Sequence, residues 1–198
     1  MRWFMIATLV VLVGLAALLV RAARQPSEFR IERSIRIQAR PEKIFPLIDD
    51  LESFNTWNPF AKADPAATFS YGTPVAGRGA AFEWDSAGPS GAGRIEIIGS
   101  TPVEGVTMSL EFRRPFAAKN VAEFTLRTTG DSTDVTWAMT GASPFLQRFM
   151  SIVFDMDKLV GGEFTKGLAD LKGIAERQGD SANSQARIPG SAGPPGRE

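Results

Sequence analysis

The chain has 198 residues, with 22 basic and 22 acidic side chains, and its formal net charge is zero. A neutral chain has no overall field to attract a polyanion, so the composition argues against a nucleic-acid partner. The absence of cysteine and histidine excludes disulfides, thiolate or imidazole catalysis, and zinc sites built from these residues. Few residue types that could catalyse a reaction remain, so the composition favours binding over catalysis. We expect no metal and no cofactor.

Residues 1–24 are predicted to be a single-pass membrane anchor. Residues 3–20 carry no charge, and as a helix they would be about 27 Å long, close to the roughly 30 Å of a bilayer core. A cleaved signal peptide is the alternative, but Arg21 and Arg24 stand where small residues are expected at a cleavage site. Arginines after the span favour a cytoplasmic domain, although a domain this long can be translocated regardless of charge.

The two remaining parts of the chain differ sharply in composition. Residues 178–198 consist mostly of Gly, Ser, Ala, Pro and charged residues, which cannot offset the entropy lost on ordering, so we expect a disordered tail. Residues 25–177 are expected to form one domain, since about 150 residues suffice for a single hydrophobic core.

Seven segments of this domain alternate apolar and polar residues, the pattern of a β-strand with one buried and one solvated face. In the first, residues 29–38, only Arg33 interrupts the alternation. Gly, Pro and Asp separate the later segments, and such short connections predict antiparallel neighbours whose polar face carries cross-strand pairs. The other segments are residues 67–71, 79–85, 93–100, 106–112, 120–128 and 133–141.

One helix is predicted after the first strand, and a second after the last strand. Residues 40–50 favour a short helix, made imperfect by Pro46. Residues 52–65 combine prolines with aromatic rings, which indicates a loop. Residues 143–177 predict a long helix that begins near Ser143, and Gly161-Gly162 predicts a kink or a close approach of its backbone. Its apolar stripe consists of Met156, Val160, Phe164, Leu168, Leu171 and Ala175.

An antiparallel sheet with one apolar face, covered by a long helix, is an α+β fold. The order of elements resembles the SRPBCC or START-like superfamily, which has the helix-grip fold, and is most similar to its polyketide cyclase/dehydrase and lipid transport branch. Some members of that branch carry an N-terminal membrane anchor. The phrases that carry the resemblance are RSIRIQARPEKIF (33–45), WNPF (57–60), GRGAAFEW (77–84), GAGRIEII (91–98), TDVTWAMTG (133–141) and MDKLVGGEFTKGLADLK (156–172).

This resemblance implies a hydrophobic cavity between the sheet and the last helix. From the apolar sheet face, the covering helix and the predicted anchor, we expect this cavity to bind a hydrophobic small molecule or lipid without catalysis. Two alternatives stay open: a cyclase or dehydratase acting on a polyketide-like substrate, and a protein-interaction domain whose apolar side chains fill the core. Wide aromatic and flexible Met side chains suit an adaptable pocket. The predicted lining is Trp57, Phe60, Phe82, Trp84, Met108, Leu110, Phe112, Phe124, Trp137, Met139, Met156, Val160 and Phe164.

No catalytic residue is assigned from the sequence. Arg33 could bind an anionic head group or turn to water, and Asp157 could face the cavity or pair with Lys158 or a loop arginine. Ser90 lies in a glycine-rich turn that lacks the nucleophile elbow and any phosphate-binding motif. Tyr71 lies at a strand end.

Overall fold

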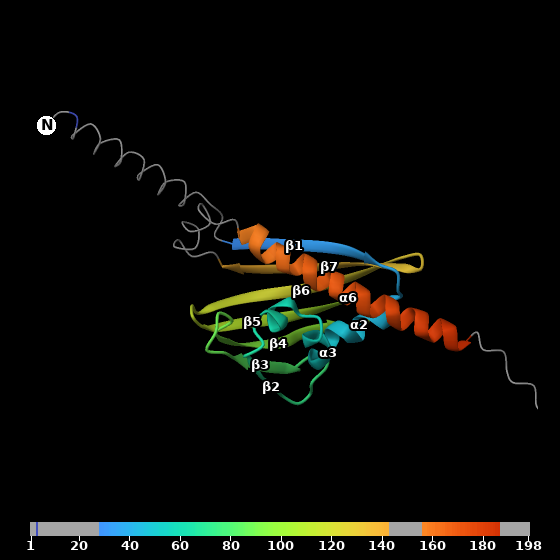
Figure 1. Cartoon of the computed structure of the whole chain (residues 1–198), viewed down its shortest axis with the longest axis horizontal. Helices are drawn as coiled ribbons and strands as arrows, with labels where there is room; N and C mark the ends of the chain where they lie inside the picture. The colour runs from blue at the N-terminus through green and yellow to red at the C-terminus, as the bar shows by residue number, and fades with distance from the viewer. Residues whose placement is uncertain (1–2, 4–27, 143–155, 187–198) are drawn as a thin grey trace, which may run out of the picture.

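The computed structural model describes Trp3, residues 28–142 and residues 156–186, and every structural statement below refers to these residues. Seven antiparallel strands form one sheet in the order β1-β7-β6-β5-β4-β3-β2. A long helix, α6, runs across one face of this sheet, and three short helices lie on the same side (Figure 1). The strands are β1 (Glu28–Ile37), β2 (Thr68–Tyr71), β3 (Ala81–Asp85), β4 (Ala92–Thr101), β5 (Gly105–Arg114), β6 (Ala118–Thr129) and β7 (Ser132–Ala142); the helices are α2 (Pro41–Asp49), α3 (Leu51–Asn55), α4 (Pro59–Ala63) and α6 (Met156–Ala186).

The structure confirms the predicted α+β architecture. All seven predicted strands are present, and each end lies within two residues of its predicted position. The predicted cross-strand pairs of the polar face are also present: Arg36 binds Asp134 at 2.7 Å, and Arg113 binds Glu83 at 2.9 Å. Since β1 and β2 lie on opposite edges of the sheet, the chain that joins them must cross the sheet, and α2, α3 and α4 make this crossing over the apolar face.

Residues 52–65 were wrongly predicted to be a loop, because they contain two short helices. The Asp50 side chain caps α3 by accepting a hydrogen bond from the Ser53 amide at 2.7 Å. Asn58 caps α4 in the same way through the Phe60 amide, and Pro59 takes the first helical position, where its missing N–H costs nothing. The polar and proline residues that suggested a loop are therefore helix-start signals.

The last helix confirms the predicted apolar stripe, since Phe164, Leu168, Leu171 and Ala175 are all buried. It ends at Ala186, later than the predicted helix end at residue 177. The predicted start near Ser143 and residues 187–198 lie outside the described part of the chain.

Helix α6 runs without interruption through Gly161 and Gly162. The predicted close approach to its backbone is made by a side chain of β1. A Cβ atom at Gly161 would clash with the guanidinium of Arg33, so glycine is needed for Arg33 to lie against the helix backbone. Gly162 has open space around its Cβ position. The sequence therefore marked a real contact at Gly161, between elements that are far apart in the chain.

The predicted membrane anchor lies outside the described residues, apart from Trp3. Among the helices that the structure describes, none combines the length and the apolarity that crossing a bilayer requires.

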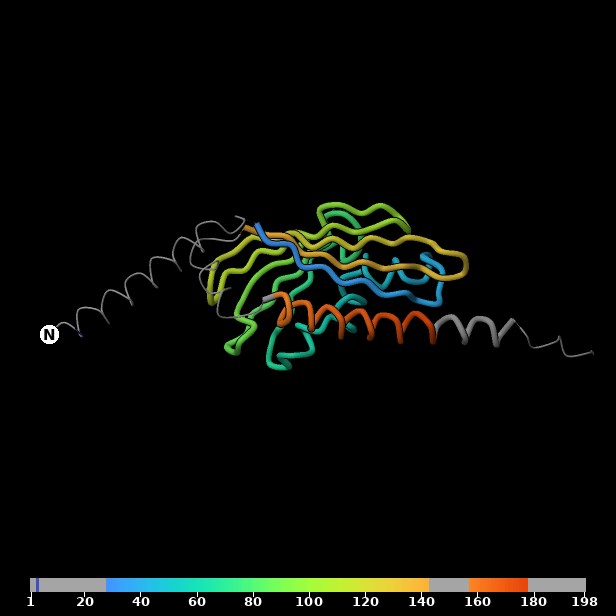
Figure 2. Tube along the Cα trace, turned by 90° about the horizontal axis from the view of Figure 1, so that it is seen from above, coloured from blue at the N-terminus to red at the C-terminus, as the bar shows by residue number. Residues whose placement is uncertain are grey.

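One end of the space between sheet and α6 is filled by α2, which contacts both α6 and the sheet strands β5 and β6. Seen from above, α6 runs along one face of the sheet (Figure 2). Buried aliphatic side chains from the helices and strands pack together at this end. They are Ile37, Ile44, Ile48, Leu51, Val106, Leu126, Val135, Leu168, Leu171 and Ala175.

A cluster of rings closes off this filled end, and we call Phe54, Trp57, Phe124, Trp137 and Phe164 the aromatic wall. Trp57 is fully buried at its centre, with ring centroids 4.9 Å from Phe54, 5.9 Å from Phe124 and 5.8 Å from Trp137, all edge to face. Its Nε1 donates to the Leu47 carbonyl at 2.7 Å. Trp137 stacks on Phe164 with centroids 4.0 Å apart, which joins β7 to α6.

Because Trp57 contacts rings from three elements, replacing it by alanine should leave a large cavity in the aromatic wall. We expect Trp57→Ala to lower the free energy of unfolding by about 3–5 kcal/mol, measured by denaturant unfolding. Phe116→Ala is the matched control, since that ring is 83% exposed and its loss should cost no more than about 0.5 kcal/mol. Equal unfolding midpoints for the two variants would contradict the role given to Trp57.

Candidate functional site

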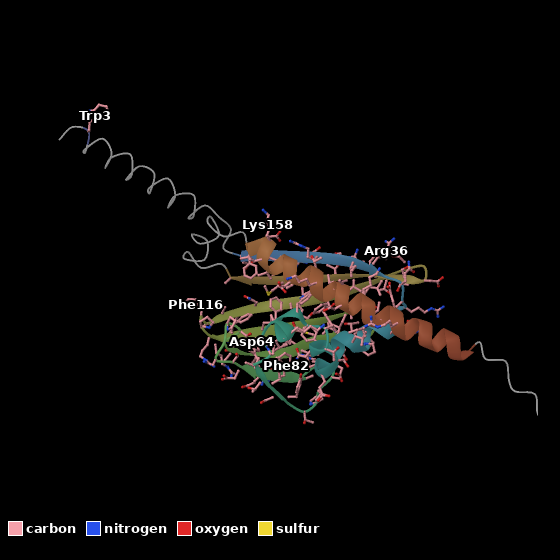
Figure 3. All side chains as sticks on the ribbon, in the orientation of Figure 1. Trp3, Arg36, Asp64, Phe82, Phe116 and Lys158 are labelled. Carbon is pink, nitrogen blue, oxygen red and sulfur yellow. The ribbon has the colours of Figure 1, made fainter. Side chains whose placement is uncertain are left out.

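Beyond the aromatic wall, the sheet and the first part of α6 enclose a cavity of about 750 Å³. Its lining includes Glu28 and Phe29 at the start of β1 and Phe116 in the β5–β6 turn, and Phe116 lies at the edge of the domain (Figure 3). This volume is within the range of small-molecule sites, about 300–1,000 Å³. The cavity exists because α2 fills only the other end, so nothing comparable enters between sheet and helix here.

Side chains of the sheet's apolar face make the floor of the cavity. Strand register explains this, because Met139, Ala122 and Met108 stand opposite one another on β7, β6 and β5 and point to the same side. The predicted lining residues found here are Phe60, Phe82, Trp84, Met108, Leu110, Phe112, Phe124, Trp137, Met139, Val160 and Phe164.

Two predicted lining residues are not placed in the cavity. Trp57 is buried as predicted, but it is not among the lining residues, whereas Phe54, Phe124 and Trp137, whose rings it contacts, are. The side chain of Met156 lies outside the described part. The predicted burial of Trp57 is therefore confirmed, and a contact of its ring with a ligand stays a prediction.

The sequence interpretation missed part of the lining. Phe29 and Ile31 reach the cavity from β1, and Phe69 and Ile95 from β2 and β4. All four stand on the apolar side of alternating strands, so the same period-2 signal would have found them. Phe54 gave no such signal, because its segment was taken for a loop.

Phe60 and Phe116 mark the open side of the cavity. Phe60 is 43% exposed, yet its ring meets Trp137 and Phe164 edge to face, each at 6.3 Å between centroids. Phe116, in the β5–β6 turn, also contributes to the lining. Exposed rings at the edge of an apolar cavity are typical of a surface that meets an apolar ligand.

Arg33 and Asp157 form an ion pair that attaches the first turn of α6 to β1. The guanidinium donates to both carboxylate oxygens, at 3.0 and 2.8 Å, and to the Asp157 carbonyl at 3.0 Å. The hydrogen bond from Arg33 lowers the pKa of Asp157 below its ordinary value. Arg33 therefore bonds to helix α6, in contrast to both predicted roles, and Asp157 pairs with a strand arginine rather than with Lys158 or a loop residue.

Asp64 joins two segments at another side of the cavity. It is 6% exposed, and its Oδ2 accepts hydrogen bonds from the Ser90 and Ser86 hydroxyls at 2.6 and 2.8 Å. Asp64 follows α4 while both serines belong to the β3–β4 turn, so this carboxylate joins two segments that line the cavity. The hydrogen bonds from Ser90 and then Ser86 lower the pKa of Asp64 below its ordinary value of 3.8.

The other catalytic candidates are also engaged in structural contacts. The Ser90 hydroxyl donates a hydrogen bond to Asp64, and the Tyr71 hydroxyl accepts a hydrogen bond from Asn55 at 2.8 Å. Within residues 28–142 and 156–186, no group of three or more acidic side chains is placed to hold a metal ion.

Comparison with protein families gives one clear result. Residues 28–176 match the family described as "Polyketide cyclase / dehydrase and lipid transport". The chain belongs to this family. Its structure is accordingly an SRPBCC-type helix-grip fold, as the resemblance of the sequence implied, and the family suggests binding of a hydrophobic ligand. Comparison with curated proteins gives no match.

Solved structures of the same fold come from several bacteria. Protein MLL2253 from Mesorhizobium loti is 15% identical, with a TM-score of 0.57 over 75% of this chain and 98% of that chain. Protein CV1439 from Chromobacterium violaceum is 14% identical, with a TM-score of 0.54 over 77% and 99%. Mll3558 from Rhizobium loti is 21% identical, with a TM-score of 0.51 over 75% and 96%. At these identities the likeness shows the fold alone.

The contacts of Asp64 predict how stability depends on pH. Because the pKa of Asp64 is lowered in the folded state, its contribution is complete above the ordinary pKa of 3.8 and is lost as the pH falls through the folded-state value. We expect Asp64→Asn to be less stable than the parent at neutral pH, with the difference narrowing at lower pH. Thermal unfolding across the pH range measures this.

Asp131→Asn is the control, because Asp131 is exposed in the β6–β7 turn and should unfold like the parent at each pH. A constant difference between the parent and Asp64→Asn from neutral to acid pH would contradict the role of the ionised carboxylate.

Proposed function

We propose that this protein binds a hydrophobic small molecule or a lipid in the cavity between the sheet and α6, without catalysing a reaction on it. The observation that carries this proposal is the cavity of about 750 Å³ and its lining of aromatic, Met and Leu side chains. Burial of apolar ligand surface there would contribute roughly 25 cal/mol per Å². The lipid transport description of the family supports the same class of ligand.

Polar groups near the cavity support binding rather than chemistry. Asp157 is ion-paired with Arg33, and the Ser90 hydroxyl is hydrogen-bonded to Asp64. The hydrogen bond from Arg33 lowers the pKa of Asp157, and a carboxylate with a lowered pKa is a weak general base. These contacts therefore favour an inert pocket over the cyclase or dehydratase alternative.

We further propose that residues 3–20 anchor the domain to a membrane, with the domain on the cytoplasmic side. Only residues 25–27 separate the predicted anchor from β1, and Glu28 and Phe29 at the start of β1 line the cavity. An anchor at this point would hold the open side of the cavity close to the bilayer, where an apolar ligand is most concentrated.

Native mass spectrometry tests the ligand-binding part of the proposal. The full chain, extracted in detergent, and a truncated chain that begins at Gln25 should each carry a co-purifying lipid or other apolar molecule. A ligand found on the full chain only would mean that the N-terminal segment, and not the cavity, holds it. Ligand-free protein in both cases would refute binding in the cavity.

A cavity-filling substitution provides the mutational test. Leu110 lines the floor of the cavity, so Leu110→Trp should occupy ligand space and remove most of the co-purifying mass. The control is Thr125→Trp, which adds the same ring on the exposed face of β6 and should leave the bound mass unchanged. Equal occupancy in the two variants would contradict the assignment of the ligand to this cavity.

A further inference from the structure

The charged residues that contribute to the cavity lining are neutralised by partners or exposed. Arg30 binds Glu32 and Glu123, with nitrogen–oxygen distances of 2.7 and 3.3 Å. Arg114 binds Asp85 at 2.7 Å. Asp157 is held by Arg33, as described above, and Glu28 is exposed at the first residue of β1. In the described part of the chain, no arginine that lines the cavity lacks a carboxylate partner.

Two of the uncharged polar side chains in the lining are engaged as well. Asn58 is 5% exposed, accepts a hydrogen bond from the Phe60 amide, and donates one to the Asn55 side chain at 3.0 Å. The Ser90 hydroxyl donates a hydrogen bond to Asp64. Both residues therefore use their polar groups to hold the walls of the cavity together.

Asn120 is different, because its carboxamide lies on the apolar floor with most of its hydrogen-bonding capacity unused. It shares the cavity-facing side of β6 with Ala122 and Phe124, and it stands opposite Leu110 on β5. Within the described residues, the only hydrogen bond of its side chain runs from Nδ2 to the sulfur of Met139 at 3.8 Å. A thioether is a weak acceptor, so one N–H and both lone pairs of the carbonyl oxygen stay available.

The neighbouring strand is adapted to this carboxamide. Gly141 of β7 pairs with Asn120, and a Cβ atom at Gly141 would clash with the Asn120 Oδ1 and with the ring of Phe29. Glycine in a strand interior is unfavourable and commonly marks a close approach. Here it makes room for a polar side chain on a face that is otherwise apolar.

We infer that Asn120 binds one uncharged polar group, a hydroxyl, carbonyl or amide, on an otherwise apolar ligand. This inference rests on the proposed function and adds the chemistry that selects among apolar ligands. A carboxamide both donates and accepts, so it suits such groups. A carboxylate would lose its hydration without gaining an unpaired cation, which makes anionic ligands unfavourable.

Competition among four probes of equal chain length tests this inference. The detergent-extracted full chain is incubated with an equimolar mixture of dodecanamide, dodecanol, dodecanoate and dodecane at neutral pH. It is then freed of unbound probe by gel filtration, and the bound probes are extracted and quantified by gas chromatography with mass spectrometry. We expect the amide and the alcohol to exceed the alkane and the carboxylate in the bound fraction.

Asn120→Leu, which is close in size, should reduce the preference for amide and alcohol over alkane by about fivefold, the effect of one neutral hydrogen bond. Gly141→Ala should give a similar loss by displacing the carboxamide without removing it. Thr125→Val, an exposed change on the opposite face of β6, should keep the preference of the parent.

The outcomes separate this inference from the proposed function. If the parent binds the probes and Asn120→Leu retains its preference, the role of Asn120 is refuted while binding of apolar ligands stands. If dodecanoate dominates the bound fraction of the parent, the uncharged class is wrong. If the parent binds none of the probes, both the inference and the proposed function fail.

Discussion

The packing of Trp57 against Phe124 and Trp137 is the interaction on which the rest of this structure depends. It joins the α3–α4 segment to the middle of the sheet, and the stacking of Trp137 on Phe164 extends the contact to α6. Edge-to-face pairs add about 0.5–1.5 kcal/mol each beyond the burial of their area. The aromatic wall therefore allows one half of the domain to be densely packed while the other half stays open.

An open apolar cavity weakens a small domain, because its lining gives up contacts that a filled core would make. Polar contacts at the edge of the cavity join its walls: the Arg33–Asp157 ion pair attaches α6 to β1, and Asp64 attaches the β3–β4 turn to the end of α4. Each of these two contacts joins elements that are distant in sequence. Their use in the fold also explains why the residues that first suggested chemistry are occupied elsewhere.

The sheet was predictable almost completely, and the site only in part. Alternation along β6 and β7 identified Phe124, Trp137 and Met139 as cavity residues, because a strand has only two faces and one of them must be dry. The same reasoning could not place Trp57, whose depth depends on two short helices with caps that resemble loop residues. It also overlooked Asn120, because only apolar side chains were considered as lining, although Asn120 lies two residues before Ala122 and four before Phe124 and therefore shares their face.

The sequence by itself determined the order of the strands along the chain, the faces of those strands and the stripe of the last helix, because these follow from the local periods of 2 and 3.6 residues. Only the tertiary structure decided how far α2 reaches between sheet and α6, and hence where the packed core ends and the cavity begins. It also decided the partners of Arg33 and the freedom of the Asn120 carboxamide. Such features depend on distances between elements, which no local pattern encodes.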